Sequence, residues 1–176
     1  MIKGITFSSD TGPWKREEID ETSRLTEEFF GMQNDSDQIP ATKENRDCVF
    51  KNTNNYLNII KNDGEIIGYF FILPCTNVLM NQFVNKEINE ARLFEEIKKV
   101  KWKGCPESIY FCSVIIKSEF RRKGLASLAA EKTINKITKN GKYKPNLFYW
   151  AYSKAGEKMG AKLASIHNLK LFKRKD

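Results

Sequence analysis

The chain has 176 residues, of which 40% are hydrophobic and 30% charged, and its formal net charge is +8. This balance excludes a disordered chain, and the length suits a single domain with one core spanning residues 1–176. The positive charge favours a polyanionic partner, which would be either nucleic acid or a nucleotide cofactor.

The first third of the chain predicts a strand, a helix and a polar stretch. Residues 2–7 alternate loosely as in a strand and are followed by turn residues. Apolar residues recur at helical spacing through residues 15–30, and Gly31 is placed to cap that helix. Residues 34–54 are polar and predict no more than a helical turn around residues 45–50.

A hairpin and two helices are predicted next. Residues 56–60 and 65–73 are rich in β-branched and aromatic residues, and Asn62-Asp63-Gly64 between them is a strong signal for a tight turn. Pro74 is expected to end the second strand. Residues 76–100 then carry apolar residues at helical spacing in two segments.

The second half begins with nine mostly apolar residues, 108–116, which predict a central strand buried on both faces. A helix over residues 125–137 follows and is closed by Asn140-Gly141. Residues 147–152 predict a further, aromatic strand.

The end of the chain predicts a short helix and a hairpin. Ser153 would cap a helix that Gly160 stops, and strand-like residues 162–166 and 169–172 flank His167-Asn168. This terminal hairpin would allow pairing across a homodimer. The order of strands and helices predicts a mixed α/β fold.

The sequence does not support assignment to the membrane, secreted or metal-binding classes of protein. The chain has no apolar run of the roughly 18 residues that span a membrane, and residues 1–7 lack the pattern of a signal peptide, so we expect a cytoplasmic protein. The four cysteines form no CxxC pair, and His167 is the single histidine. We therefore expect neither a metal site nor a disulfide framework.

The junction between the central strand and the next helix carries the chemistry. The first N–H groups of a helix, together with the positive end of its dipole, form a site for a diphosphate. Gly124 and Ala126 lack bulk, so phosphate oxygens can approach the backbone amides. Arg121, Arg122 and Lys123 add positive charge where the anion would lie.

Residues 114–126, Val-Ile-Ile-Lys-Ser-Glu-Phe-Arg-Arg-Lys-Gly-Leu-Ala, resemble the acetyl-CoA signature of the GNAT superfamily of N-acetyltransferases. That signature is a hydrophobic strand end, a short polar step, an aromatic residue and Arg/Gln-x-x-Gly-x-Gly/Ala. The resemblance implies a central mixed sheet of six to seven strands, flanked by helices, with splayed central strands. It also implies transfer of an acetyl group from acetyl-CoA, or of another short acyl group, to a primary amine without a metal.

The resemblance also implies which residues bind the cofactor. The family pairs the strand end with the pantetheine arm and the acyl carbonyl, a role that falls on Val114, Ile115 and Ile116. The loop amides hold the pyrophosphate, with the Arg121 side chain nearby. By position, these amides belong to Arg122, Lys123, Gly124, Leu125, Ala126 and Ser127. Residues 108–116 and 147–152 would be the two strands that part around the pantetheine arm.

The catalytic acid and base depart from the family pattern. Gly156 stands where the family's tyrosine acid is expected, four residues before the closing glycine. Tyr152 is our substitute as proton donor to the leaving thiolate, and its alternative role is that of an aromatic core residue. Tyr110 occupies the place of the strand glutamate that some members use as base. Glu107 is the nearest carboxylate and a second candidate for the base, although it could equally be a solvated charge at the strand end. A chain of water molecules to bulk solvent could also take the place of a protein base.

Residues 76–106 are longer than the family's usual turn and are interpreted as a helical insertion. Four acids lie in it: Glu87, Glu90, Glu95 and Glu96. They would wall the acceptor site and attract a cationic amine, or they would form an ordinary solvated helix face. The acceptor itself stays open among small polyamines, aminoglycoside-like amines, amino acids and protein amines.

Two other functions stay open. A non-enzymatic acyl-CoA-binding regulatory module would explain the missing acid and base. A nucleic-acid-binding domain would explain the net charge and the aromatic run Phe148-Tyr149-Trp150, but the chain has no recognisable binding motif. Cys112 as an acyl-carrying nucleophile has no activating base in the sequence, so we interpret it as a buried strand cysteine.

Overall fold

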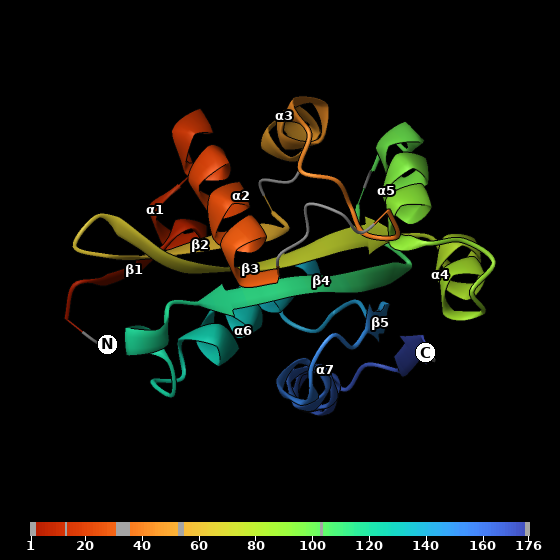
Figure 1. Cartoon of the computed structure of the whole chain (residues 1–176). Coiled ribbons are helices and arrows are strands. Elements are labelled where there is room, and N and C mark those ends of the chain that lie inside the picture. Colours follow the sequence, from red (N-terminus) through yellow and green to blue (C-terminus); the bar gives the residue numbers. More distant parts are fainter. Residues whose placement is uncertain (1–2, 13, 31–35, 53–54, 103, 175–176) are drawn as a thin grey trace. The chain divides into compact units, whose positions relative to one another are not determined.

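The computed structural model describes residues 3–12, 14–30, 36–52, 55–102 and 104–174. The elements are β1 (Ile5–Phe7), α1 (Ser8–Thr11), α2 (Arg16–Phe30), α3 (Lys43–Asn52), β2 (Leu57–Asn62), β3 (Glu65–Cys75), α4 (Asn77–Val84), α5 (Glu90–Lys99), β4 (Ser108–Ile116), the 3-10 helix η2 (Ser118–Phe120), α6 (Leu125–Ile137), β5 (Asn146–Trp150), α7 (Lys154–His167) and β6 (Leu171–Arg174). The strands form one sheet in the order β1-β2-β3-β4-β5-β6 (Figure 1). Pairing is antiparallel from β1 to β2 and from β2 to β3, and parallel from β4 to β5 and from β5 to β6. The predicted mixed α/β fold class is confirmed.

Local turn chemistry explains the hairpin in the first half of the sheet. Asp63 and Gly64 both have positive φ, 48° and 91°, as a two-residue turn between twisted strands requires. Strand β3 runs on through Pro74 to Cys75, so the proline does not end it as predicted. The helical turn predicted at residues 45–50 is part of the longer helix α3, whereas the predicted cap at Gly31 lies outside the described residues.

The end of the chain differs from the sequence prediction. Helix α7 continues through Gly160 to His167, so residues 162–166 are helical and no hairpin forms there. Gly160 serves packing instead, because a Cβ on it would lie 3.3 Å from the ring of Tyr149. Asn168, with φ 51°, adopts the left-handed conformation that ends the helix. The chain then returns as β6, which pairs parallel to β5.

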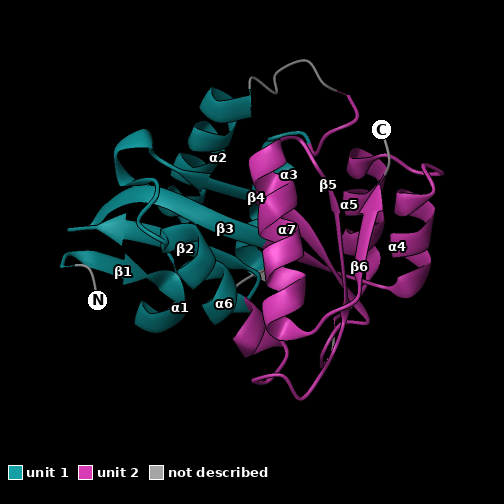
Figure 2. Cartoon of the chain, turned by 90° about the horizontal axis from the view of Figure 1, so that it is seen from below, with its two compact units in different colours: residues 1–35, 40–71, 114–133 teal, residues 36–39, 72–113, 134–176 magenta. Residues whose placement is uncertain are grey.

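The described residues fall into two compact units (Figure 2). Unit 1 contains residues 1–35, 40–71 and 114–133, and unit 2 contains residues 36–39, 72–113 and 134–176. The core of unit 1 gathers apolar side chains of α2, β2, β3 and β4 around Ile19, Ile59 and Ile115. Burial of these side chains stabilises the unit by the hydrophobic effect.

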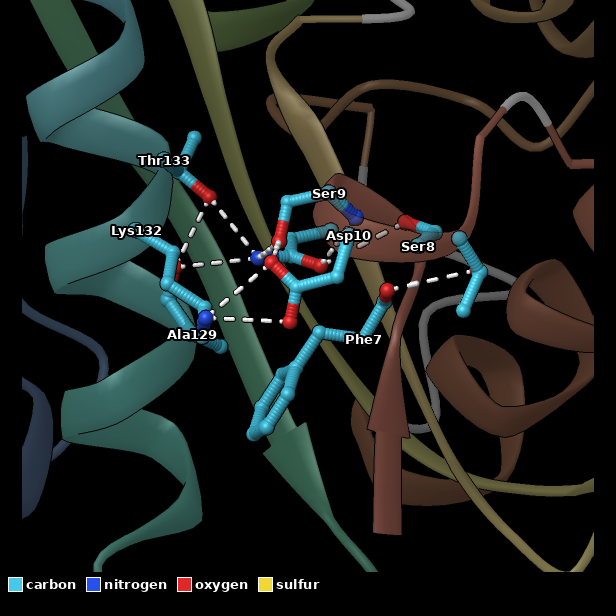
Figure 3. A network of polar contacts seen from close by, with 9 residues as sticks. Phe7, Ser8, Ser9, Asp10, Ala129, Lys132 and Thr133 are labelled. Carbon is cyan, nitrogen blue, oxygen red and sulfur yellow. Dashed lines mark hydrogen bonds and ion pairs between the residues drawn. The ribbon is translucent and has the colours of Figure 1, made fainter. Parts of the chain in front are cut away.

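A network of polar contacts in unit 1 fastens α1 to α6 (Figure 3). Asn58 is 2% exposed, and its Nδ2 lies 3.1 Å from Ser9 Oγ, 3.1 Å from the Ala129 carbonyl oxygen and 3.2 Å from Thr133 Oγ1. At its rim Lys132 forms an ion pair with Asp10. A buried amide is tolerated only when it is hydrogen-bonded, so these partners hold the middle of α6 in place.

The core of unit 2 is aromatic. Phe83 of α4 lies edge-on against Tyr110 of β4 and Phe148 of β5, with ring centroids 5.1 and 5.9 Å away. Arg174 of β6 is buried beside them, and its guanidinium carbon lies 4.6 Å from the Phe83 ring centroid and 5.0 Å from that of Trp150. Arg174 Nη1 donates to the carbonyl oxygens of Phe83 and Ile88. This arginine therefore fixes the last strand to the segment around α4.

Candidate active site

Strands β4 and β5 pair over only part of their length. Their register joins residues 108–111 to residues 146–149, and β5 ends at Trp150, whereas β4 continues to Ile116. No residue of β5 is therefore in register with residues 112–116, all of which are described. The pairing of β4 with β5 thus ends before the last five residues of β4, whereas the parting of the two strands around a pantetheine arm stays a prediction. The predicted cofactor-binding residues Val114, Ile115 and Ile116 all lie on this stretch.

The basic loop lies between η2 and α6. Arg122 and Gly124 have positive φ, 62° and 77°, which turns the chain sharply before Leu125 begins the helix. The loop residues from Arg121 to Gly124 are exposed, and a Cβ built on Gly124 would meet no atom within 4 Å. The hydrogen-bond ladder of α6 starts where Leu128 N–H donates to the Gly124 carbonyl oxygen, at 3.0 Å. The amides of Leu125 and Ala126 precede that ladder, as an anion site at a helix start requires, and the predicted Ser127 lies in the same turn.

Arg121 has a second role that the sequence did not indicate. Its Nε donates to the Ile116 carbonyl oxygen at 2.8 Å, and its guanidinium carbon lies 5.4 Å from the ring centroid of Phe29. The side chain thus ties the loop to the end of β4 and packs against α2. Lys123 lies beside Phe120, with its Nζ 5.0 Å from that ring centroid. Its head group is therefore on the exposed side of the same loop.

The three predicted catalytic residues have different surroundings. Tyr152 is 67% exposed and directly precedes Ser153, the N-cap of α7, so it is not a core residue. Glu107 lies before β4, at the opposite end of that strand from Ile116, and its carboxylate accepts a hydrogen bond from the Asn77 backbone N–H at 2.8 Å. This contact satisfies an amide at the start of α4, which is a structural task.

Tyr110 is buried and its hydroxyl donates to Glu90 Oε1 at 2.7 Å. Burial, and then the charge of Glu90, raise the pKa of Tyr110 well above its usual value, so the phenol is neutral at physiological pH. The strand position that carries a glutamate in some relatives thus holds a tyrosine that reaches a carboxylate on another element. That element is α5, within the predicted insertion.

Glu90 differs from the other acids of the insertion. It is 8% exposed, whereas Glu95 and Glu96 form ion pairs with neighbouring cations along the α5 surface. The signal was present in the sequence, because Glu90 shares the helical spacing of the buried Leu93, Phe94 and Ile97. The prediction of a solvated face therefore fits Glu95 and Glu96, but it is wrong for Glu90.

Cys112 is the first residue of β4 beyond the β5 register, and its sulfur lies 3.9 Å from Glu90 Oε1. Desolvation, and then the nearby charge of Glu90, raise the pKa of the Cys112 thiol well above its usual value. A thiol in this state is a poor nucleophile because the thiolate is the reactive form. Among the residues that the structure describes, no three His, Cys, Asp or Glu side chains are grouped to hold a metal ion, and no helix is long and apolar enough to span a membrane.

Comparison with known proteins identifies the class of protein. A sequence match over most of the chain, together with the fold, defines an acyltransferase enzyme. The match is to the acetyltransferase (GNAT) family over residues 19–151, and the chain belongs to this family. The resemblance of residues 114–126 to the acetyl-CoA signature is thereby confirmed at the level of the family.

Among solved structures, one similar chain is the aminoglycoside acetyltransferase meta-AAC0020 from an uncultured soil metagenomic sample, in complex with trehalose. The TM-score is 0.50, the sequence identity 15%, and the similarity covers 92% of this chain and 86% of that chain. This likeness shows that the two chains share the fold. No curated protein sequence matches the chain.

Proposed function

We propose that the protein transfers an acetyl group from acetyl-CoA to a primary amine by direct attack of the amine on the thioester. The observation that carries the proposal is the turn at Arg122 and Gly124, which opens the start of α6 to an anion directly after the unpaired end of β4. Both features lie within one run of the chain, residues 112–127, which also carries the sequence signature.

The loop supplies backbone N–H groups and positive charge for the pyrophosphate of the cofactor. Gly124 offers open space next to its backbone, so phosphate oxygens can reach the amides of Leu125 and Ala126. Peptide groups of Val114 to Ile116 would pair with the pantetheine arm, in the manner of an added strand. Arg121 orients the end of β4 through the Ile116 carbonyl, so cofactor loop and strand are held as one unit.

Direct attack is favoured over a covalent acyl-enzyme. Cys112 is the thiol on the end of β4 that has no partner in β5, and its raised pKa leaves it protonated at physiological pH. In the direct route the amine nitrogen bonds to the thioester carbon, the C–S bond breaks, and the sulfur takes up a proton. Tyr152, exposed between β5 and the N-cap of α7, is our candidate for the donor of that proton.

The acceptor is an amine of a class that the family resemblance leaves open. The similar solved structure is described as an aminoglycoside acetyltransferase, and we include aminoglycosides among the acceptors to be tested. Polyamines are the other small cationic amines that we propose to test as acceptors.

The cofactor site is tested by a matched pair of glycine substitutions. Gly124 and Gly104 have nearly equal positive φ, 77° and 78°, and a Cβ on either would meet no atom within 4 Å. Both Gly→Ala changes therefore strain the backbone equally, by about 1 kcal/mol. Only Gly124→Ala should weaken acetyl-CoA binding, by about tenfold or more in isothermal titration calorimetry. Equal affinities of Gly124→Ala and Gly104→Ala for acetyl-CoA would contradict the proposed cradle.

A regulatory acyl-CoA-binding module is the second candidate function. It is favoured by one observation, that Tyr110 fills the strand position of the usual base and Glu107 is engaged by Asn77. Incubation of the protein with acetyl-CoA and a panel of spermidine, tobramycin and lysine-containing peptides separates the two functions. Release of free thiol above the rate without amine supports the enzyme, and tight binding without release supports the module.

A further inference from the structure

A buried carboxylate on the insertion helix is the feature that the proposed chemistry has not used. Glu90 is the first residue of α5, directly after the N-cap Asn89, and only 8% of its surface is exposed. A carboxylate that is taken out of water at such a cost requires compensating contacts. The hydrogen-bond donors around the Glu90 carboxylate supply this compensation.

Three donors surround the two oxygens of Glu90. Oε1 accepts from the Tyr110 hydroxyl at 2.7 Å and lies 3.9 Å from the Cys112 sulfur, and Oε2 accepts from the Ile39 backbone N–H at 3.2 Å. The positive end of the α5 dipole adds to these contacts. All of them are contacts that a carboxylate oxygen accepts, so the Glu90 side chain is held as a hydrogen-bond acceptor beside β4.

The contacts also place Glu90 beside Tyr110 and Cys112, which precede Val114 on the same strand β4. Tyr110 occupies the strand position of the usual base, and Cys112 is the first residue beyond the register with β5. Alternate residues of a strand project from the same face, so Tyr110 and Cys112 present one face of β4 to Glu90. The carboxylate that the strand lacks is thus supplied from α5.

We infer that Glu90 is the proton acceptor for the attacking amine, an inference that rests on the proposed acetyl transfer. The substrate ammonium gives one proton to the Glu90 carboxylate, directly or through one water, and becomes a neutral amine. Its nitrogen then bonds to the thioester carbon. When the C–S bond breaks, its electron pair stays on sulfur, the thiolate takes a proton from the Tyr152 hydroxyl, and Tyr152 regains a proton from the second one that the nitrogen loses. Glu90 returns its proton to solvent, so one proton is released per amide formed.

The two ionisable side chains of β4 that contact Glu90 do not titrate in the working range. Tyr110 and Cys112 on β4 both have pKa values raised well above their usual ones, so they stay neutral. The other charged groups nearby are Arg174 of β6, whose charge lowers the pKa of Tyr110, and Asp37, which accepts a hydrogen bond from the Asn89 side chain. The acid limb of the pH profile therefore reports on Glu90 and the substrate amine.

The test is Glu90→Gln, which keeps the size of the side chain and an acceptor for Tyr110. With acetyl-CoA and spermidine or tobramycin, we expect kcat/KM to fall by about 100-fold or more at pH 7. The deficit should shrink toward pH 9, where more of the amine is already neutral. Acetyl-CoA affinity should stay within twofold of the wild type. Glu95→Gln, on the exposed face of the same helix, is the matched control and should behave as wild type.

A second variant distinguishes a catalytic role of Glu90 from a merely structural one. Tyr110→Phe removes a donor to the ionised carboxylate, so the acid limb of kcat/KM should move to higher pH by roughly half a unit or more. This readout decides the question if Glu90→Gln does not fold, as judged by circular dichroism. An unmoved acid limb, a Glu90→Gln deficit that is equal at pH 7 and pH 9, or a kcat/KM within twofold of wild type would each overturn the inference. A wild-type protein that acetylates no amine would instead overturn the proposed function, and this inference with it.

Discussion

Gly68 of β3 lies against Ile115 of β4 with no room for a side chain between them. A Cβ built on Gly68 would overlap the Ile115 carbonyl oxygen and would lie 2.9 Å from Cδ1 and 3.1 Å from Cα of Ile116. Just beyond, the Lys117 backbone N–H donates to the Ile67 carbonyl oxygen at 2.8 Å. The glycine thus lets β3 approach the stretch of β4 that we assign to the cofactor.

Gly68→Ala should destabilise the protein by about 2–3 kcal/mol, because backbone rather than a flexible side chain must move to make room. The same shift of Ile115 and Ile116 should weaken acetyl-CoA binding. Urea unfolding and calorimetry measure the two effects. Gly156→Ala is the matched control: its Cβ would meet only Ser153 Oγ at 3.5 Å, and alanine favours the helix by up to about 1 kcal/mol. A Gly68→Ala protein as stable as wild type would show that β4 can move freely.

Tyr152→Phe tests the proposed proton donor. The substitution removes only the hydroxyl of an exposed side chain, so stability should stay within about 0.5 kcal/mol. We expect kcat with acetyl-CoA and an acceptor amine to fall by about tenfold or more, while acetyl-CoA affinity is unchanged. Tyr143→Phe, which alters a partly exposed ring between Lys139 and Lys142, is the control. An unchanged turnover rate in Tyr152→Phe would remove this residue from the mechanism.

Arg174→Ala should cost about 2–4 kcal/mol of unfolding free energy. The guanidinium is buried between Phe83 and Trp150 and bonds two carbonyl oxygens, which are left without that donor when the side chain is truncated. The neighbouring Lys173 forms an exposed ion pair with Glu157, so Lys173→Ala should cost less than about 1 kcal/mol. Chemical denaturation of the two variants side by side measures the difference, and equal costs would contradict the anchoring role of Arg174.

Stability should fall as pH rises above about 9. Burial raises the pKa of Cys75 from 9.0 to about 12, and those of Tyr110 and Cys112 are raised as well. The folded state therefore keeps protons that the unfolded chain releases, and the contribution of each group is full below its unfolded pKa and lost as pH climbs above it. Each group removes up to about 1.4 kcal/mol per pH unit in that window.

Urea unfolding at pH 7.5, 9 and 10 checks this prediction. Cys75→Ala should lose stability less steeply with pH than the wild type, because one of the proton-holding groups is gone. A wild-type free energy of unfolding that stays constant from pH 8 to pH 10 would contradict the assignment. The measurement needs no ligand, and the difference between Cys75→Ala and the wild type isolates the contribution of Cys75.

Features set by neighbours in sequence were predictable. The turn at Asp63-Gly64 and the loop at Arg121 to Gly124 need particular backbone conformations. The residue types at these positions indicate those conformations in the sequence. The prediction that Gly160 ends a helix is wrong because this glycine makes room for the ring of Tyr149. A contact with another element cannot be inferred from a glycine within a helical pattern. His167 and Asn168 resembled a strand turn, yet Asn168 in the left-handed conformation ends helix α7 equally well.

The candidate site shows the same division. The cofactor loop could be located from its motif, whereas the contact of Arg121 with Ile116 and that of Glu90 with Tyr110 join residues that the sequence does not link. Glu90 and Tyr110 are twenty residues apart and belong to a helix and a strand. Only the three-dimensional packing of α5 against β4 shows which of the four acids in the insertion is buried.

The division of the chain into units has a consequence for how the protein is made. Each unit is assembled from separated stretches, and Asp10 in the first of them pairs with Lys132, 122 residues later. Neither unit can therefore complete its packing during synthesis until the ribosome has released most of the polypeptide. Loops of this length slow folding, and a nascent chain that ends before Lys132 would lack the Thr133 partner of the buried Asn58 side chain.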